Sequence, residues 1–89
     1  MPEQSIEEIV GEYILALTGS EIEMEPEITL ESLNVDSISL VKIFVFIERT
    51  FGVSLVDSGV TRENVETFGK LTGFVRSLLP LKPIKPQDS

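Results

Sequence analysis

The sequence contains neither cysteine nor histidine. Without cysteine the chain forms no disulfide and offers no thiolate to a metal ion, and its cysteine usage indicates no redox compartment. Without histidine, typical zinc sites and histidine-assisted serine catalysis are excluded as well. Carboxylates alone could support acid-base chemistry, but no pocket can be inferred for them, so we expect no enzymatic activity from this chain alone.

The chain also lacks long apolar runs and has no cation near its start. The opening MPEQSIEEIV has neither the positive start nor the apolar centre of a signal peptide, and no apolar run is long enough to span a bilayer. The net charge is −8, from 15 acidic and 7 basic residues, and nucleic acids and anionic membranes repel such a chain. We therefore expect a soluble, cytoplasmic protein with no nucleic-acid or membrane partner.

Negative charge is concentrated in the first half of the sequence. Residues 1–41 hold ten carboxylates and no Lys or Arg, whereas residues 42–89 hold seven cations and five carboxylates. An acidic front half of this kind could bind a basic protein. An unmodified helical interaction module is therefore one alternative for the function.

The length and composition indicate one small domain followed by a tail. The chain has 89 residues, of which 42% are hydrophobic, and a mean hydropathy of +0.19, which is enough apolar material for a compact core. Pro80, Pro83 and Pro86 recur at every third position and favour an extended tail. We expect a domain over 1–79 and a flexible Pro-rich tail over 80–89, with a PxxP ligand as the alternative interpretation of the tail.

A first helix is predicted over residues 5–17, where apolar residues recur at helical spacing. Ser5 and Glu8 have the spacing of a capping box, and Gly19 follows as a stop signal. Residues 18–35 then form a long loop in which four glutamates alternate with apolar residues, and Pro26 argues against a strand there. Weak calcium binding by this run is an alternative, but the run lacks the ligand spacing and glycine of an EF-hand.

A second helix is predicted over residues 37–51, because Asp36 can cap its start and Gly52 its end. The centre of this helix is apolar nearly all round, as expected of a buried central helix. We expect the following residues to supply core contacts: Ile38, Val41, Val45, Ile47 and Phe51. The alternative is that Leu40 and Phe44 lie in a surface for a partner.

The last part of the chain is predicted to hold a short helical turn at 61–66 and a helix that begins at Thr67. The spacing of Gly69 and Gly73 favours close packing against a neighbouring helix. We expect the inner face of this helix to contain Phe68, Leu71, Phe74, Val75 and Leu78. Residues 53–56 could pass for a strand but have nothing to pair with, so we expect a loop.

The stretch from Leu33 to Leu40 places a serine directly after an acidic helix cap. The first turn of a helix has unpaired N–H groups and lies at the positive end of the helix dipole, so an anion on Ser37 would be stabilised there. Taken alone, the Asp36-Ser37 pair is most simply a helix cap followed by a first-turn residue. The pattern of the whole chain favours a functional role for this pair.

The whole pattern resembles an acyl or peptidyl carrier protein over about residues 5–79. The features that carry the resemblance are a small acidic helical chain, a long first loop that ends in the motif Leu-x-x-Asp-Ser-Ile, an apolar helix behind it and the sequence Phe-Gly-Val-x-Leu at its end. The resemblance implies an all-α fold, a small four-helix bundle of three longer helices and one short helix. It also implies that Ser37 is esterified by 4'-phosphopantetheine, which a separate magnesium-dependent phosphopantetheinyl transferase delivers from coenzyme A.

The resemblance assigns roles to the neighbours of Ser37. Asp36 looks like the residue that helps to organise metal and phosphate in the transferase complex, and Ile38 and Val41 resemble hydrophobic residues that partner enzymes touch. The family often has glycine at the position of Asn34, and asparagine tolerates a left-handed backbone well enough for the turn to survive.

The second helix departs from the fatty-acid carriers, which present mostly carboxylates there. This chain has Lys42, Glu48 and Arg49 instead, which disfavours fatty-acid synthase partners. The stretches 41–43, 46–49, 51–54 and 60–65 look more like the free-standing aminoacyl carriers of natural-product pathways. That narrower resemblance implies a monomeric carrier of an aminoacyl thioester, loaded by an adenylation enzyme or an acyltransferase and used by tailoring or condensing enzymes. A polyketide or fatty-acid type of acyl carrier protein is the alternative.

Overall fold

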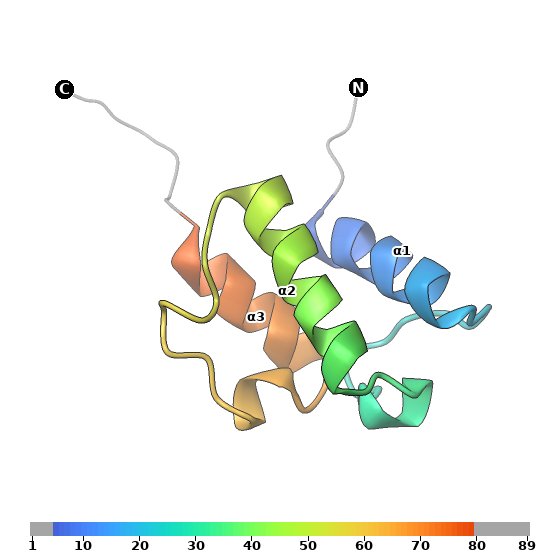
Figure 1. Ribbon diagram of the computed structural model, residues 1–89. Coiled ribbons are helices and arrows are strands. Elements are labelled where there is room, and N and C mark those ends of the chain that lie inside the picture. Colours follow the sequence, from blue (N-terminus) through green and yellow to red (C-terminus); the bar gives the residue numbers. More distant parts are fainter. Residues whose placement is uncertain (1–4, 80–89) are drawn as a thin grey trace, which may run out of the picture.

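The computed structural model describes residues 5–79, and the tail expected over 80–89 lies outside them. Within these residues the chain folds into helices joined by loops, with no β-strand (Figure 1). In chain order the elements are the helix α1 (Ile6–Thr18), the 3-10 turn η1 (Glu31–Leu33), the helix α2 (Ser37–Phe51), the 3-10 turn η2 (Glu63–Val65) and the helix α3 (Phe68–Leu78). The all-α class is confirmed, but a count of four helices is not, because the short helix expected at 61–66 is a single 3-10 turn.

The ends of α1 follow directly from local sequence signals. The Glu8 amide donates a hydrogen bond to Ser5 Oγ (3.1 Å), and the Ser5 amide donates one to Glu8 Oε1 (3.0 Å), which completes the capping box. Gly19 ends the helix in a left-handed conformation (φ 70°) that glycine adopts without steric cost. The predicted first helix is therefore confirmed to within one residue at each end.

The helix α2 buries only one side, contrary to expectation. Ile43 and Ile47, one turn apart, are completely buried. Ile38, Val41 and Val45 remain exposed, so the prediction that they contribute to the core was wrong. Since apolar residues lie on nearly every side of this helix, its periodicity does not distinguish the face that packs from the face that meets solvent.

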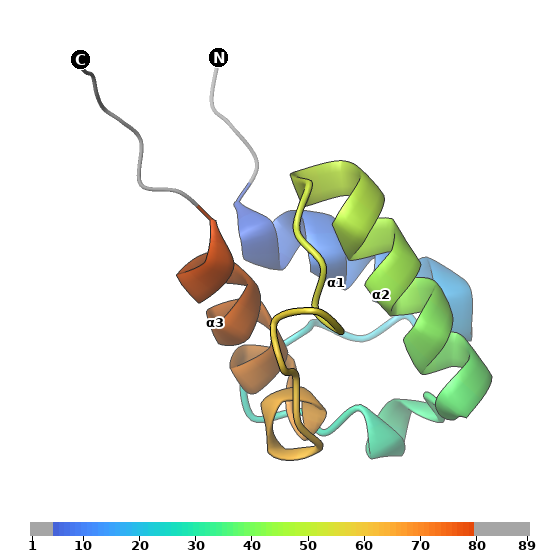
Figure 2. The same cartoon turned by 60° about the vertical axis from the view of Figure 1, so that its left-hand side comes forward.

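The core is formed by all three helices and by the loops between them. The helix α1 packs against both α2 and α3, and the segment that joins α2 to η2 lies between those two helices (Figure 2). Leu55 in this segment is only 2% exposed, so it fills the space that α2 and α3 leave between them. The buried apolar residues are Val10, Ile14, Leu30, Leu33, Ile43, Ile47, Leu55, Phe68, Leu71 and Val75.

The helix α3 packs closely against the first loop. A Cβ atom on Gly69 would lie 2.9 Å from Pro26 Cβ and 3.0 Å from the Pro26 carbonyl oxygen, so only glycine fits. A Cβ atom on Gly73 would meet nothing within 4 Å. The expected close contact of the two glycines with a neighbouring helix is thus wrong for Gly73, and for Gly69 the neighbour is a loop. Of the expected inner face of α3, Phe74 and Leu78 are only half-buried.

Backbone hydrogen bonds tie the first loop to the segment that leads into α3. The Phe68 amide donates to the Ile28 carbonyl (2.8 Å), and the Leu30 amide donates to the Glu66 carbonyl (3.2 Å). Leu30 and Leu33 are also buried, so the loop is anchored at both its backbone and its side chains. This anchoring fixes the position of the turn that precedes α2.

Candidate functional site

A tight turn positions the start of α2. Asn34 adopts a left-handed backbone (φ 64°), and its amide donates a hydrogen bond to the Glu31 carbonyl (3.0 Å). The Val35 amide donates to the Leu30 carbonyl (3.1 Å), which closes the turn. The expectation that asparagine would support this turn in place of glycine is confirmed, since its short polar side chain tolerates the left-handed region.

Asp36 caps α2 through its side chain. Its Oδ1 atom accepts a hydrogen bond of 2.8 Å from the Ser39 amide. This hydrogen bond lowers the pKa of the Asp36 carboxyl below its ordinary value of 3.8, so the group is ionised at neutral pH. The Ser39 side chain lowers this pKa as well, and the carboxylate therefore caps the helix while it stays charged and exposed beside Ser37.

Ser37 is the first residue of α2 and is exposed to solvent. Its hydroxyl makes no hydrogen bond with any residue in 5–79, so neither the fold nor the cap uses this oxygen. An acceptor oxygen or an anion attached at this point lies at the positive end of the dipole of a helix of 15 residues. Ser37 thus combines accessibility with a favourable field for negative charge.

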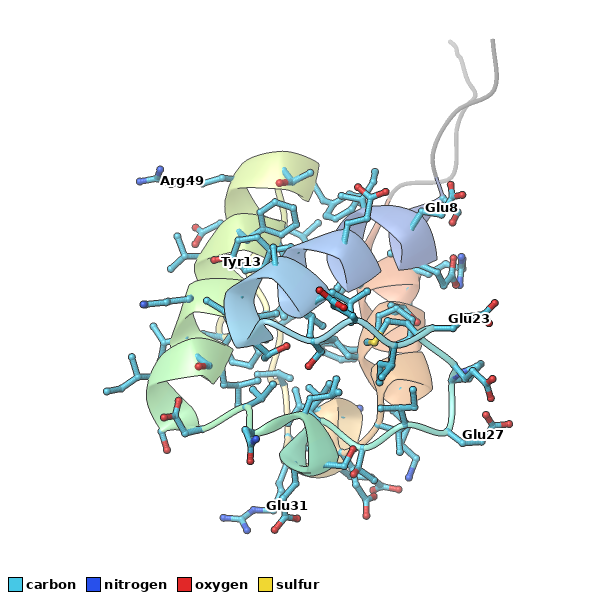
Figure 3. All side chains as sticks on the ribbon, turned by 90° about the vertical axis from the view of Figure 1, so that its right-hand side faces the viewer. Glu8, Tyr13, Glu23, Glu27, Glu31 and Arg49 are labelled. Carbon is cyan, nitrogen blue, oxygen red and sulfur yellow. The ribbon has the colours of Figure 1, made fainter. Side chains whose placement is uncertain are left out.

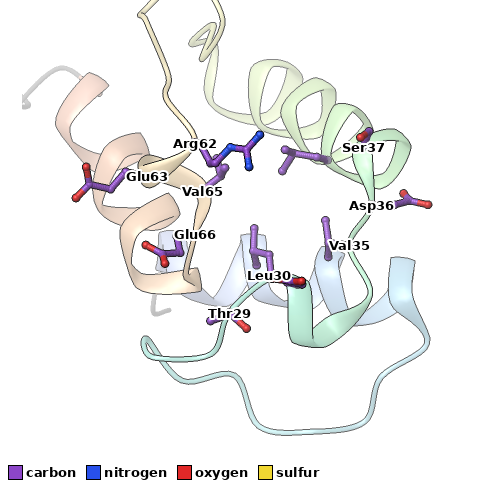
Figure 4. A pocket seen from close by; sticks show the side chains of 11 residues that line it. Thr29, Leu30, Val35, Asp36, Ser37, Arg62, Glu63, Val65 and Glu66 are labelled. Carbon is purple, nitrogen blue, oxygen red and sulfur yellow. The ribbon is translucent and has the colours of Figure 1, made fainter.

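A groove of about 890 Å³ opens beside Ser37, between the start of α2 and η2 (Figure 4). Its apolar residues Leu30, Val35, Leu40 and Val65 belong to the core or pack against it. Its polar lining consists of Thr29, Glu31, Asp36, Ser37, Arg62, Glu63 and Glu66. The serine hydroxyl therefore stands at the edge of a depression with apolar patches and a charged rim.

The exposed apolar residues of α2 form a stripe on its outer face. The exposed fractions are 69% for Ile38, 58% for Val41 and 42% for Val45, and spacings of three and four residues place them on one side of the helix. Lys42 and Arg49 are exposed beside this stripe. We call these five residues the outer face of α2.

The expected interface residues therefore lie together on one side of α2, with Glu48 exposed near its end. Lys42, Glu48 and Arg49 make no ion pair within residues 5–79, whereas the charges on α1 and α3 do pair, through Glu7 and Arg76. Figure 3 shows Arg49 pointing outward from α2, well away from the acidic residues Glu23 and Glu27 of the first loop. The charges of α2 are thus free to meet another molecule.

Two residues of interest were missed from the sequence. Val45 was predicted to be buried, although its spacing of seven residues from Ile38 could have placed it on the same face. Arg62 lines the groove from η2, far along the chain from Ser37, and no local pattern could have indicated this. Among the described residues, carboxylates do not gather into a group that could hold a metal ion. The helices of that same part of the chain are too short or too polar to cross a bilayer.

Comparison with known families gives a match over most of the chain. Residues 6–75 match the family described as phosphopantetheine attachment site, a range that includes α1, α2, both 3-10 turns and most of α3. Comparisons with curated proteins and with solved structures found no match. Members of the family are generally non-catalytic and interact with phosphopantetheinyl transferases and biosynthetic enzymes. The chain belongs to this family, so the protein is a carrier whose cofactor, 4'-phosphopantetheine, is covalently attached to a serine.

Proposed function

We propose that Ser37 is the serine that carries the 4'-phosphopantetheine arm, and that the protein holds an aminoacyl or acyl intermediate as a thioester at the end of this arm. The observation that carries the proposal is the exposed Ser37 hydroxyl, which has no hydrogen-bond partner within residues 5–79, at the first position of α2 directly after the Asp36 cap. The chain has no cysteine, so a thioester on it requires the thiol that the cofactor supplies.

The residues around Ser37 can accommodate a covalently attached phosphopantetheine arm. The Ser37 hydroxyl is exposed, so Oγ can form a bond to phosphorus without displacing a buried neighbour, and the helix dipole stabilises the phosphodiester charge. Asp36 is ionised and exposed directly before Ser37. Its carboxylate is suited to orient a magnesium ion in the transferase complex, since magnesium is commonly bound through carboxylates.

Shuttling requires successive partners, and the outer face of α2 is suited to receive them. Ile38 and Val41 lie within about one turn of Ser37 and offer exposed apolar surface. Lys42 and Arg49 add positive charge that no carboxylate of the described residues pairs with, and such charge influences encounter rate and discrimination between partners. Under this proposal the phosphopantetheinyl transferase contacts the end of this face next to Ser37, and the loading enzyme and the enzymes that use the thioester contact the whole face in turn.

The attachment site is tested by intact mass after incubation with coenzyme A, magnesium and a broad-specificity phosphopantetheinyl transferase. We expect the wild type to gain the mass of one phosphopantetheine and Ser37→Ala to gain none. Ser58→Ala is the control, since it removes the hydroxyl of another exposed serine that makes no side-chain hydrogen bond within residues 5–79 and lies outside the Asp36-Ser37 turn. It should be modified like the wild type. Modification of Ser37→Ala, with its helical circular dichroism intact, would contradict the assignment.

The cargo is proposed to be aminoacyl, with a polyketide or fatty-acid type of acyl cargo as the alternative. The proposal depends on the cations Lys42 and Arg49, which are exposed on the outer face of α2. Fatty-acid carriers present mostly carboxylates on this helix. The holo protein should be offered aminoacyl transfer by adenylation enzymes and, separately, malonyl transfer by a fatty-acid malonyltransferase. We expect faster initial rates of aminoacylation. Efficient malonylation without aminoacylation by any of those enzymes would favour the alternative.

A further inference from the structure

Arg62 faces the groove beside Ser37 without a charged partner of its own. It precedes η2, its side chain is exposed, and Figure 4 shows its guanidinium extending across the groove towards the start of α2. The Arg62 side chain makes no ion pair or hydrogen bond with any other residue in 5–79. A guanidinium carries five N–H donors in a fixed plane, so this side chain brings a large donor capacity to the groove.

The carboxylates around Arg62 accept no hydrogen bond from its guanidinium within residues 5–79. Among the described residues, four carboxylates line the groove, those of Glu31, Asp36, Glu63 and Glu66, and Arg62 is the one cation there. Glu63 and Glu66 are held by Lys70, whose Nζ lies 3.7 Å and 3.3 Å from their carboxylate oxygens. The nearest acidic residues on η2 are therefore paired on the side of α3, which leaves Arg62 directed to the groove.

We infer that Arg62 binds the phosphopantetheine arm, donating hydrogen bonds from its guanidinium to carbonyl oxygens of the arm while the arm lies in the groove. This inference rests on the proposal that Ser37 carries the arm. The arm contains two amide carbonyls and a pair of methyl groups, so it needs both donors and apolar surface. Arg62 supplies the donors, and Leu40 and Val65 supply half-buried apolar surface in the same groove.

The physical consequence is an equilibrium between an arm held in the groove and an arm free in solvent. Arg62 is exposed, so its hydrogen bonds compete with water, and they stabilise the held state only modestly. A modest bias suits a carrier, because a partner enzyme on the outer face of α2 can draw the arm out of the groove. Arg62 thereby sets how much of the cofactor is held against the protein between encounters.

The experiment compares backbone amide chemical shifts of the apo and holo forms by heteronuclear NMR. The proteins are the full chain as wild type, Arg62→Met and Arg49→Met, each with its mass checked before and after modification. Methionine keeps an unbranched side chain and removes the charge and all donors. Arg49→Met is the matched control because Arg49 is also exposed and unpaired within 5–79 but lies in the last turn of α2, away from the groove. If Arg62→Met loses its helical signal, Arg62→Ala, which also removes the charge and all donors, takes its place.

We expect attachment of the arm to shift the Leu40 and Val65 amides and the Arg62 side-chain N–H of the wild type. In Arg62→Met the shifts at Leu40 and Val65 should be smaller by about two- to fivefold, the range expected for an exposed charge-assisted contact. Arg49→Met should match the wild type. Holo protein of the correct mass with no shift at Val65, or with equal shifts in Arg62→Met, overturns the inference and leaves the attachment site intact. Absence of the mass gain in the wild type refutes both.

Discussion

The two faces of α2 contain similar residues in different surroundings. Ile43 and Ile47 on the inner face are completely buried, whereas Ile38 on the outer face is 69% exposed. All three are isoleucines of one helix, so side-chain type does not explain the difference. The inner face is covered by α1 and by the loops, and nothing within residues 5–79 covers the outer face. Burial in this small protein is thus set by the arrangement of the other elements around α2.

The difference has an energetic meaning. Burying an isoleucine side chain fully stabilises a folded or a bound state by about 1.5–3 kcal/mol. The inner isoleucines contribute this energy to folding, while Ile38 and Val41 leave it available for association with another protein. A helix with these two faces can hold the fold together and still receive partners next to Ser37.

The largest predicted effect is a loss of stability when a buried side chain of the inner face of α2 is shortened. Ile47→Ala should lower the free energy of unfolding by about 2–5 kcal/mol, because it leaves a cavity in a core that loops partly form. Ile38→Ala removes the same atoms from the outer face and should change it by less than about 0.5 kcal/mol. Urea denaturation of both variants and the wild type measures this. Equal losses in the two variants would contradict the assignment of the faces.

A second prediction extends the comparison to two glycines of α3. Gly69 packs against the first loop, whereas Gly73 has no neighbour within 4 Å among the described residues. Gly69→Ala should cost about 1–3 kcal/mol, because its Cβ would lie 2.9 Å from Pro26 and the backbone of the loop must move. Gly73→Ala meets nothing within 4 Å and should stabilise the helix by up to about 1 kcal/mol.

Thermal denaturation of the two alanine variants gives opposite shifts of the midpoint under this prediction. Both substitutions add the same methyl group to the same helix, so helix propensity cancels in the comparison. A stabilised Gly69→Ala variant would show that α3 does not pack closely on the loop at Pro26.

The ends of the helices could be predicted from the sequence because their signals are local. Ser5 and Asp36 cap their helices through hydrogen bonds that span three residues, and Gly19 and Gly52 adopt the left-handed conformation at the opposite ends. Asp36 and Ser37 could be singled out for the same reason, as a cap and a first-turn residue. These features require only the neighbouring sequence.

The remaining features depend on contacts between distant segments. The sequence of α2 is apolar all round, so only the positions of α1 and the loops determine which side is buried. Leu55 is buried because the segment after α2 lies between two helices, and Arg62 approaches the site only through the placement of η2. No periodicity or local motif contains this information. The burial of Ile47 was predicted correctly and Phe51 packs against the core, but Ile38, Val41 and Val45 were assigned wrongly and the groove was not predicted.

The third prediction concerns the charges of the outer face. The double variant Lys42→Glu with Arg49→Glu should slow loading of the holo protein by its partner enzyme by about tenfold at low salt, since exposed charges mainly influence encounter rate. The mass gain on phosphopantetheine attachment should stay unchanged, because attachment depends chiefly on the Asp36-Ser37 turn. The unfolding midpoint should also stay unchanged, because both side chains are exposed and make no ion pair within residues 5–79. Loading at the wild-type rate at every salt concentration would exclude these cations from the interface.

The smallest predicted effect concerns the ion pair between Arg76 and Glu7, in contrast to the charges of α2, which make no ion pair within residues 5–79. Arg76 Nη2 of α3 donates a hydrogen bond to Glu7 Oε1 of α1 (2.9 Å) and lies 2.7 Å from Oε2. Partial burial raises the pKa of Glu7, but the hydrogen bond and charge of Arg76 outweigh it and hold the pKa below its ordinary value of 4.5. The two side chains are 40% and 55% exposed, so Glu7→Gln should cost less than about 1 kcal/mol at neutral pH.

The sign of the pH dependence follows from the lowered pKa of Glu7. A carboxyl that titrates lower in the folded state than in the unfolded state stabilises the fold above its unfolded pKa, near 4.5, and loses this contribution as pH falls through the folded pKa. Urea denaturation at about pH 7 and about pH 3 should therefore show a difference between wild type and Glu7→Gln that shrinks in acid. Glu48→Gln on α2, which removes a carboxylate without an ion pair in the described chain, should show no comparable difference at neutral pH. A Glu7→Gln difference of the same size at both pH values would mean that the side chain stabilises the fold by packing and that its charge contributes nothing.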